Sequence, residues 1–574
     1  MVSSAVRNLA VLATAMILLP LLAGDLWAYE VSLYLTYGIV ATGLGLAWGL
    51  SGTLSLGHGL YMAISAYLAA NVFIVLDGSG LAWPAAFLCA LIPMVIAFII
   101  AFGVFKGQTG NATSFSMVTL ALALAGGQIA IGWSSVTGGF NGLLGVPPLP
   151  GISGIIEQYA LVGAATLVVC AGYVWLISAP LGTVWKAVAA DERRMQFLGF
   201  DTALLKALAF AVSGFCAGLG GVIYAQQQGI VTPDLSGFAF CGSLLVYVAV
   251  GGRMSVFGPL VGALVVGLLS SELRDRVDWW ELVLALVFIV VVLRFPKGLA
   301  GIIPTSASVT NLPMSVEAPC LKGERSALSC QLQGISVKMG SVQILNGLNF
   351  FAEQGKTTCI IGPNGAGKSS SFNALTGLLP LSGGALSLDG KPIRKATPAA
   401  LTLAGVSRKF QAPTVFPTLT IRENLSLGLW SKRASTVDLL NRRLWQWNSP
   451  LLAELKRRFE FLAQDAKLAS DLSHGQRQIL ELSMVLLTEP RLLLLDEPCA
   501  GLSQDETFAV IDLAKWIRAK TGMTIVVVEH DMALVEALAD TVNVFHQGRF
   551  LAKGTIEEVR ANDDVRNVYV GGQR

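Results

Sequence analysis

Residues 358–369 of the chain read TCIIGPNGAGKS, an apolar run followed by a glycine-rich loop that ends in lysine and serine. A buried strand, this loop and a helix expected over residues 369–378 form the context in which such a pattern binds phosphate. The glycines let backbone N–H groups point at one anion beside the positive end of the helix. We expect Lys368 to reach the β- and γ-phosphates of a nucleotide and Ser369 to place its hydroxyl on Mg²⁺. The predicted nucleotide-binding residues are Gly362, Pro363, Asn364, Gly365, Ala366, Gly367, Lys368, Ser369 and Ser370.

A second apolar run, residues 492–495, ends in two carboxylates, Asp496 and Glu497. Short apolar runs of this kind predict the buried strands of an α/β domain. Asp496 suits Mg²⁺, either directly or through water, and Glu497 suits the general base that polarises an attacking water. Acids at a strand end are often no more than surface residues. Beside a phosphate-binding loop they indicate nucleotide hydrolysis.

Between these motifs lies the stretch Leu472-Ser473-His474-Gly475-Gln476, which resembles the LSGGQ signature of the ABC transporter ATPase family except at His474. The resemblance covers residues 328–574 and implies an α/β P-loop ATPase domain that binds ATP and Mg²⁺. It also implies that Ser473 and Gly475 contact the γ-phosphate of an ATP held by the opposite subunit. Two ATPase domains must therefore meet head to tail.

The same resemblance assigns further side chains. Gln411 matches the Q-loop residue, which senses Mg²⁺ and faces the permease, and residues 500–503 match the loop that joins the two ATP sites. His530 matches the switch histidine that holds the γ-phosphate. A lone histidine is more often structural, but its place after an apolar run and beyond Glu497 favours the switch role. The predicted catalytic residues are Glu497, His530 and Gln411, and the predicted Mg²⁺ ligands are Ser369, Asp496 and Gln411.

One position departs from that family. The family stacks adenine on an aromatic residue just before a glycine near the domain start, where this chain has Met339 before Gly340. A thioether can still pack on a purine face. We therefore expect the departure to affect nucleotide affinity or base preference more than hydrolysis.

The amino-terminal half has the composition of a membrane domain. The chain is 53% hydrophobic and only 13% charged, with a mean hydropathy of +0.63, and residues 1–304 hold long stretches without charge. Since a spanning helix needs about 20 apolar residues, we expect a polytopic α-helical membrane domain over residues 1–304, a linker over 305–327 and the ATPase over 328–574. About ten spans are predicted, at residues 8–24, 31–50, 59–76, 83–104, 113–132, 157–178, 204–225, 236–251, 256–271 and 280–294.

Charge placement predicts the orientation of this domain. Under the positive-inside rule, the amino terminus and the ATPase lie in the cytoplasm, and the first apolar segment is a retained helix rather than a signal peptide. Only Arg274 and Arg276 then fall on the opposite side from Arg7, Lys106, Lys186, Arg193, Arg194, Lys206, Arg253, Arg294 and Lys297. The net charge of +3, without a Lys/Arg-rich run, gives no reason to expect nucleic acid as a partner. The eight cysteines are scattered and read as apolar fillers.

Three stretches of the membrane domain resemble the permeases of importers for branched-chain amino acids, urea and amides. They are residues 51–59, with an SLGH element, residues 133–142, with TGG and NG, and residues 294–299 at the last span. Glycine-rich breaks within apolar spans can line a polar path or can serve close helix packing, and both readings stay open. The candidates for the solute path are His58, Gly57 and Asn141, with His58 equally readable as a structural residue.

Residues 181–201 resemble the segment through which importer permeases couple to their ATPase, with Ala190, Asp191, Glu192 and then Gly199 as matching positions. The resemblance implies that this segment docks in a groove near Gln411. Because no charged residue falls deep in a proposed span, the cargo is expected to be neutral or zwitterionic.

Together these features predict an ATP-driven importer subunit in the inner, or plasma, membrane, for branched-chain amino acids or for urea and short amides. The alternatives are an ABC exporter and an ATP-gated regulator without transport. The expected partners are the lipid bilayer, an extracytoplasmic solute-binding protein, and a second permease and ATPase, supplied by a paralogue or by a second copy of this chain.

Overall fold

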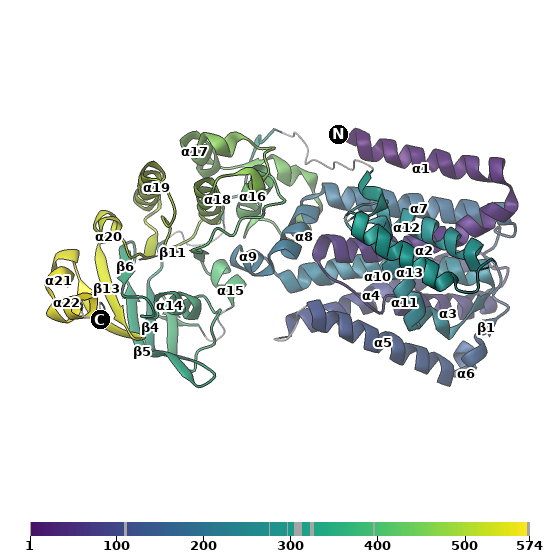
Figure 1. Cartoon of the computed structure of the whole chain (residues 1–574), viewed down its shortest axis with the longest axis horizontal. Helices are drawn as coiled ribbons and strands as arrows, with labels where there is room; N and C mark the ends of the chain where they lie inside the picture. Colours follow the sequence, from purple (N-terminus) through teal and green to yellow (C-terminus); the bar gives the residue numbers. More distant parts are fainter. Residues whose placement is uncertain are drawn as a thin grey trace. The chain divides into compact units, whose positions relative to one another are not determined.

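The computed structural model describes residues 2–107, 112–274, 276–295, 297–302, 313–321, 326–393 and 397–570. The chain divides into two compact units (Figure 1). One comprises Met1–Ala190 and Thr202–Asn311, and the other comprises Asp191–Asp201 and Leu312–Arg574. Pro296 and parts of the predicted linker and carboxyl terminus lie outside the described residues.

The first unit, the permease unit, is helical, and a helix lies over each of the ten predicted apolar segments. These helices are α1 (Val2–Ala23), α2 (Asp25–Ser51), α3 (Gly59–Val75), α4 (Ala82–Lys106), α5 (Ala112–Gly132), α7 (Ile155–Ser178), α10 (Thr202–Gln228), α11 (Phe238–Gly251), α12 (Gly258–Arg274) and α13 (Trp280–Arg294). Short elements connect them: α6 (Ser134–Thr137), η1 (Gly139–Asn141), β1 (Leu143–Leu144), α8 (Pro180–Ala190), β2 (Ile230–Val231), η2 (Pro233–Ser236) and η3 (Leu299–Ile302).

By length and hydropathy, five of these helices could cross a membrane within the described part of the chain: α2, α4, α5, α7 and α10. The shorter apolar stretches Arg7–Leu22, Gly59–Val75 and Phe238–Gly251 lie on α1, α3 and α11. The helical character of the domain is therefore confirmed, whereas the count of about ten spans is not. Length is the reason, since α11 has only 14 residues, which is too few to cross about 30 Å of hydrocarbon.

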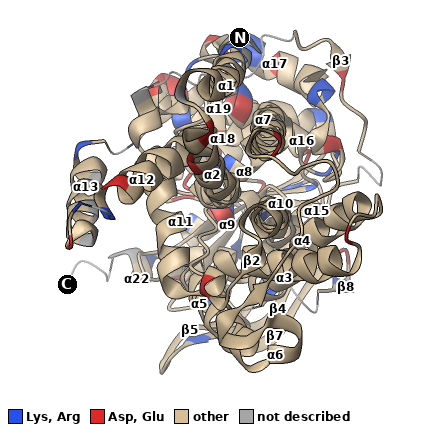
Figure 2. Ribbon diagram, turned by 90° about the vertical axis from the view of Figure 1, so that its right-hand side faces the viewer, with Lys and Arg blue, Asp and Glu red and all other residues tan. Residues whose placement is uncertain are grey.

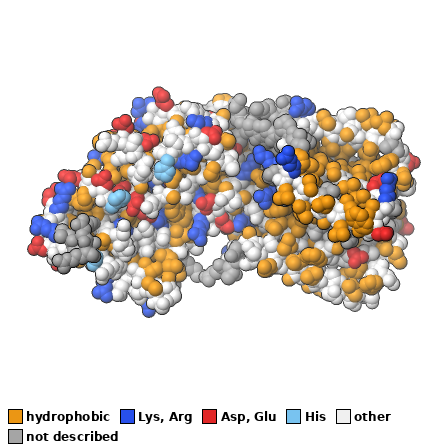
Figure 3. All heavy atoms as spheres, in the orientation of Figure 1, with side chains coloured by type: hydrophobic (Ala, Val, Ile, Leu, Met, Phe, Trp, Pro, Cys, Tyr) orange, Lys and Arg blue, Asp and Glu red, His pale blue; other side chains and the backbone are white. Residues whose placement is uncertain are grey.

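The outer faces of the permease unit are apolar. Figure 3 shows hydrophobic side chains gathered over these helices, and α4 alone exposes Phe87, Leu88, Ile92, Val95 and Ile99. In Figure 2 the ribbons of these helices are mostly uncharged, and α3 and α5 contain no Lys, Arg, Asp or Glu. An exposed apolar surface of this extent suits lipid rather than water.

Helix α10 packs against α2, α3 and α4 at the centre of this unit. Its glycines permit the close approach, because a Cβ at Gly218 would overlap the carbonyl oxygen of Ala90 and one at Gly221 would overlap that of Met62. Small residues at such crossings let helix backbones approach closely in a membrane. For α10, the glycines therefore serve packing.

The second unit, the ATPase unit, contains a six-stranded sheet in the order β14-β13-β6-β12-β11-β9, in which only the edge strand β14 is antiparallel. A four-stranded antiparallel sheet has the order β5-β4-β7-β8, and β3 pairs with β10. The strands are β3 (Val316–Glu317), β4 (Cys330–Met339), β5 (Val342–Ala352), β6 (Thr357–Ile361), β7 (Gly383–Leu388), β8 (Lys391–Pro392), β9 (Val406–Lys409), β10 (Trp447–Asn448), β11 (Leu492–Asp496), β12 (Thr524–Val528), β13 (Thr541–His546) and β14 (Arg549–Gly554).

The helices of the ATPase unit are α9 (Glu192–Phe197), α14 (Lys368–Leu375), α15 (Pro398–Leu403), α16 (Ile421–Trp430), α17 (Pro450–Arg458), α18 (His474–Leu487), α19 (Gln504–Thr521), α20 (Met532–Leu538), α21 (Ile556–Ala561) and α22 (Asp563–Val570), with 3₁₀ turns η4 (Asp438–Leu440), η5 (Arg442–Gln446), η6 (Glu460–Ala463) and η7 (Ala469–Asp471). Most of these helices connect the strands, whereas α9 precedes the first strand and α21 and α22 follow the last. The central strands β6, β11 and β12 are buried along their whole length. Their continuous apolar runs follow from burial on both faces of a parallel sheet.

Candidate active site

The predicted ATP-site residues follow four neighbouring parallel strands, β6, β12, β11 and β9. The phosphate loop follows β6, and His530 lies just after β12. Asp496 is the last residue of β11 and Glu497 follows it, while Gln411 lies just after β9. Since the carboxyl ends of parallel strands meet at one edge, the sheet gathers these side chains there, where α/β folds bind ligands.

The phosphate loop passes directly into α14, which begins at Lys368, one residue before the predicted start. Gly365 and Gly367 have φ angles of 82° and 94°, a left-handed conformation that glycine adopts without strain. Lys368 Nζ donates hydrogen bonds to the carbonyl oxygens of Gly362 at 2.6 Å and Pro363 at 3.2 Å. Burial lowers the pKa of Lys368, whereas the charges of Glu497 and Asp496 act to raise it. The lysine is thus held across the loop, where a nucleotide phosphate would attract it.

Glu497 is the residue to which the other strand-end groups converge. Gln411 Nε2 donates to Glu497 Oε2 at 2.8 Å, and His530 Nδ1 lies 3.8 Å from Glu497 Oε1. The φ angle of Glu497 is 44°, which a residue other than glycine seldom adopts and which is found at functional sites. A partly exposed carboxylate held by an amide is suited to accept a proton from water.

Asp496 is buried and has a partner that was not predicted. Arg408 Nη2 donates to Asp496 Oδ2 at 2.7 Å, and Arg408 Nη1 donates to Asn373 Oδ1 at 2.7 Å. The sequence signal was available, because a charged residue inside the short buried strand β9 needs a charged or polar partner. Arg408 therefore fixes the orientation of the Asp496 carboxylate.

The residues predicted to hold Mg²⁺ fit a hard cation. Asp496 Oδ1 is buried without a hydrogen-bond partner among the described residues. Ser369 is exposed, near the start of α14. The described residues contain no cluster of three or more His, Cys, Asp or Glu that could hold a metal alone. This agrees with the chemistry of Mg²⁺, which takes one or two protein oxygens and completes its shell with phosphate and water.

The signature residues form the start of another helix. Ser473 caps α18, with its hydroxyl accepting from Gln476 N at 3.1 Å while Gln476 Oε1 accepts from Ser473 N at 3.2 Å. A Cβ at Gly475 would overlap the carboxylate of Glu506. Within the described part of the chain, no hydrogen bond or ion pair joins the signature to the phosphate loop. The structure therefore does not bring these two motifs together in one chain.

Met339 ends β4 and its side chain is 57% exposed. Nothing in the structure places it against the phosphate loop, so its contact with adenine stays a prediction.

Met339→Tyr is expected to lower the Kd for ATP about two- to tenfold, because an aromatic ring adds about 0.5–1.5 kcal/mol beyond its buried area when it stacks. Titration with ATP in the absence of hydrolysis measures this change. Val437→Tyr, at an exposed position just before the 3₁₀ turn η4, is the control, and a Kd for Met339→Tyr equal to that of the wild type would contradict the stacking role.

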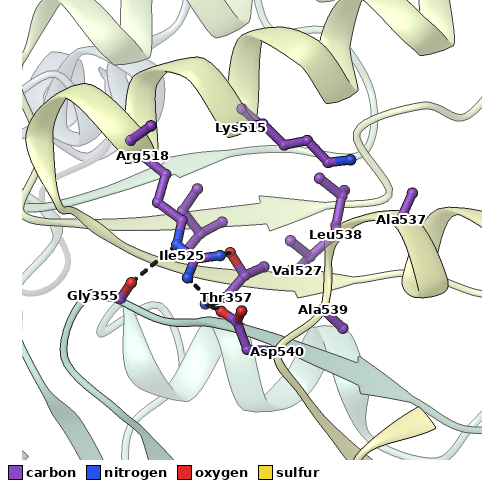
Figure 4. A pocket seen from close by; sticks show the side chains of 12 residues that line it. Gly355, Thr357, Lys515, Arg518, Ile525, Val527, Ala537, Leu538, Ala539 and Asp540 are labelled. Carbon is purple, nitrogen blue, oxygen red and sulfur yellow. Dashed lines mark hydrogen bonds and ion pairs between the residues drawn. The ribbon is translucent and has the colours of Figure 1, made fainter. Parts of the chain in front are cut away.

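A separate hollow of about 450 Å³ lies at the amino ends of β6 and β12, between α19 and α20 (Figure 4). Arg518 crosses it, donating to Gly355 O and Thr357 Oγ1 and pairing with Asp540 at 2.7 Å. None of the predicted site residues lines this hollow. Its Arg518 ties α19 to the start of β6, which is a structural role.

In the permease unit, the candidates Gly57 and His58 are consecutive residues. Among the described residues, no hydrogen bond links Asn141 to either of them. The His58 side chain is fully buried, with Nε2 3.1 Å from Ser213 Oγ on α10, and a Cβ at Gly57 would overlap the carbonyl oxygen of Thr119 on α5. Asn141 ends the 3₁₀ turn η1 and is exposed. His58 thus has a side-chain partner and Gly57 permits close packing against α5. A place for either residue on the solute path stays a prediction.

The fold and the site define an ABC-type ATPase joined to a helical permease. The family model for the permease component of branched-chain amino acid transport systems matches residues 28–293, and the ABC transporter model matches residues 345–500. The chain belongs to the branched-chain amino acid family of ABC transporters and carries the permease and the ATPase in one polypeptide. It hydrolyses ATP in a reaction coupled to transport, and it is a membrane protein whose ATPase is cytoplasmic.

The similar proteins of known family match the ATPase part of the chain. The high-affinity branched-chain amino acid transport ATP-binding protein BraF of Pseudomonas aeruginosa is 34% identical over 253 residues, which are 42% of this chain and 97% of that protein. The corresponding protein LivG of Escherichia coli K12 is 33% identical over 248 residues, covering 42% of this chain and 96% of that protein. Among solved structures, the ADP conformation of an ATP-binding cassette of an ABC transporter matches with a TM-score of 0.37 and 28% identity, over 43% of this chain and 99% of that one.

Proposed function

We propose that the chain is the fused permease and ATPase of an importer that moves a small neutral or zwitterionic solute across the inner membrane, with branched-chain amino acids as its main cargo. Its relatives BraF and LivG are named for branched-chain amino acid transport. The glycine-rich SLGH and TGG elements of the permease and the neutral character of its spans support the same class of cargo.

The observation that carries the proposal is the place of the predicted coupling segment. Ala190 ends α8 in the permease unit, whereas Asp191–Asp201 belongs to the ATPase unit. Within that unit Phe197 packs edge-on against Phe410, with ring centroids 4.8 Å apart. Because Phe410 directly precedes Gln411, a segment from the permease sequence contacts the loop that holds the candidate base.

The arrangement supports in-line attack of water on the γ-phosphate of ATP. Lys368 would exchange its loop carbonyls for the β- and γ-phosphates, and Glu497, held by Gln411, would take a proton from the attacking water. Mg²⁺ would neutralise charge on the phosphate oxygens, with Ser369, Asp496 and Gln411 as the residues that hold it. His530, 67% exposed beside Glu497, would hold the γ-phosphate.

The signature motif supports a second ATPase domain as a partner, because its resemblance implies that Ser473 and Gly475 contact an ATP held by the opposite subunit. Branched-chain amino acid ABC systems work as multi-subunit complexes, and we propose that a paralogous permease and ATPase, or a second copy of this chain, completes each ATP site. An extracytoplasmic binding protein would deliver the solute.

The alternatives are less well supported. The longest permease helices, α2 and α10, have 27 residues, and such a helix is about 40 Å long, close to the full thickness of a bilayer. An exporter with helices that extend far into the cytoplasm does not fit these lengths. A regulator without transport would tolerate a damaged ATP site, whereas Lys368, Glu497 and His530 are all present.

Uptake of radiolabelled solutes tests the cargo. Vesicles that hold the assembled complex, with ATP inside and the binding protein and leucine outside, are expected to accumulate leucine about tenfold or more over vesicles with ADP, because hydrolysis is coupled to movement. Urea and acetamide serve as parallel substrates. Accumulation of urea or acetamide without leucine would replace the proposed cargo, and efflux in place of uptake would identify an exporter.

A further inference from the structure

A buried arginine of the coupling segment forms an ion pair inside the ATPase unit. Arg194 lies on α9, and its Nη1 is 3.3 Å from Glu481 Oε1 on α18, with both side chains fully shielded from solvent. Burial lowers the pKa of Arg194, and the charge of Glu481 opposes that shift. A buried guanidinium needs such a partner, because an unpaired charge in the interior is strongly unfavourable.

The Glu481 carboxylate also holds both sides of the Q-loop. Its Oε1 accepts from Thr414 Oγ1 at 2.7 Å and from Phe410 N at 3.4 Å, so it bonds to the chain immediately before and just after Gln411. One turn earlier on α18, Gln478 Nε2 donates to the carbonyl oxygen of Gln411 at 3.1 Å. Since Gln411 Nε2 donates to Glu497, the position of the base depends on this loop.

A second contact leads from the same arginine toward Asp496. Arg194 Nη1 donates to the carbonyl oxygen of Arg408 at 3.3 Å, and the Arg408 side chain is the one that pairs with Asp496. Arg194 therefore touches the strand that carries the partner of one acid. Through Glu481 it is linked to the loop that carries the partner of the other acid.

Other contacts hold the coupling segment without Arg194. Thr402 Oγ1 donates to the carbonyl oxygen of Phe197 at 3.1 Å, Ser431 Oγ donates to that of Leu198 at 2.5 Å, and Phe197 packs on Phe410. Loss of the Arg194 charge therefore leaves the segment with its main attachments. What Arg194 contributes is the orientation of the Glu481 carboxylate, through their ion pair.

The pair is also incompletely formed. Nε and Nη2 of Arg194 and Oε2 of Glu481 are buried without a hydrogen-bond partner among the residues that the structure describes. Arginine and carboxylate commonly form two parallel bonds. A small movement of α9 would therefore change how firmly the carboxylate is held.

We propose that Arg194 is a positioning residue for ATP hydrolysis, which acts through Glu481 on the Gln411 loop and so sets the orientation of Glu497. The inference rests on the proposed function only in taking residues 181–201 as the coupling segment. It gives that segment a defined atomic role: a residue that interrupts the permease sequence but belongs to the ATPase unit positions part of the hydrolytic site.

The test is steady-state ATP turnover by the assembled complex. Arg194→Met is expected to lower kcat about tenfold or more while the KM for ATP stays within about twofold, because a small displacement of a catalytic group is costly and the phosphate loop is untouched. Arg194→Lys should recover most of kcat. Arg193→Met removes the neighbouring exposed arginine and should leave turnover unchanged.

A double variant separates positioning from folding. Arg194→Met with Glu481→Met removes both buried charges, a replacement that often leaves stability intact, so a folded complex with kcat as low as in Arg194→Met is expected. Full recovery of kcat in the double variant, or a raised KM with unchanged kcat in Arg194→Met, would overturn the proposal. Because this experiment measures only ATP turnover, its outcome does not depend on the cargo. If leucine is not transported, the proposed cargo fails but the role of Arg194 is still tested.

Discussion

Glu497→Gln is expected to bind ATP normally and to lose turnover about 10²- to 10⁴-fold, the range that a positioned general base contributes. The change keeps the shape of the side chain and removes its proton affinity. Gln411 contacts the substituted group directly, whereas the phosphate loop does not. The Kd for ATP should therefore stay within about twofold of the wild-type value, since the binding groups are unchanged.

Single-turnover hydrolysis and equilibrium ATP binding on the same preparation measure the two quantities. Glu536→Gln is a matched control, because Glu536 is an exposed acid on α20 whose partner is Arg560. This control should hydrolyse ATP at the wild-type rate. Near-normal hydrolysis by Glu497→Gln would remove Glu497 as the base.

Arg408→Met should produce the largest loss of stability. Arg408 and Asp496 are both almost fully buried, and Arg408 Nη2 lies 2.7 Å from Asp496 Oδ2. Removal of one partner leaves an uncompensated buried carboxylate, which costs about 3–5 kcal/mol. For a domain the size of the ATPase unit, this corresponds to a decrease in melting temperature of about 6–20 °C.

Thermal unfolding of the assembled complex, followed by a probe in the ATPase unit, measures this decrease. Arg549→Met is the control, because Arg549 is exposed at the start of β14, and it should leave the melting temperature almost unchanged. Arg408→Met with Asp496→Asn removes the stranded charge and should restore part of the loss. A melting temperature for Arg408→Met equal to that of wild type would show that the ion pair does not stabilise the fold.

Three of the strand-end residues, Lys368, Glu497 and His530, could be predicted from the sequence, because each lies beyond an apolar run at which a parallel strand ends. Gln411 follows the polar strand β9 and was assigned only by its resemblance to the Q-loop residue. This logic located Lys368, Glu497 and His530 without knowledge of the strand order. The partner of Asp496 could not be found in that way. Arg408 meets Asp496 because β9 and β11 are neighbours in the sheet, in a register that pairs Arg408 with Leu494, and strand order is a property of the tertiary fold.

The coupling segment shows the same limit. Residues 181–201 were recognised by their resemblance to a coupling segment, yet that pattern did not indicate that Arg194 is buried or that Glu481 faces it. These residues are 287 positions apart in the sequence. In the permease, hydropathy located the apolar helices but could not distinguish a spanning helix from a short one such as α11.

We propose that this chain couples ATP hydrolysis to solute import. The most direct measurement is the simultaneous recording of leucine uptake and phosphate release in vesicles that hold the assembled complex and its binding protein. We predict that uptake requires ATP, rises together with phosphate release, and disappears with Glu497→Gln. Leucine uptake that continues without ATP, or at the wild-type rate in Glu497→Gln, would contradict the account.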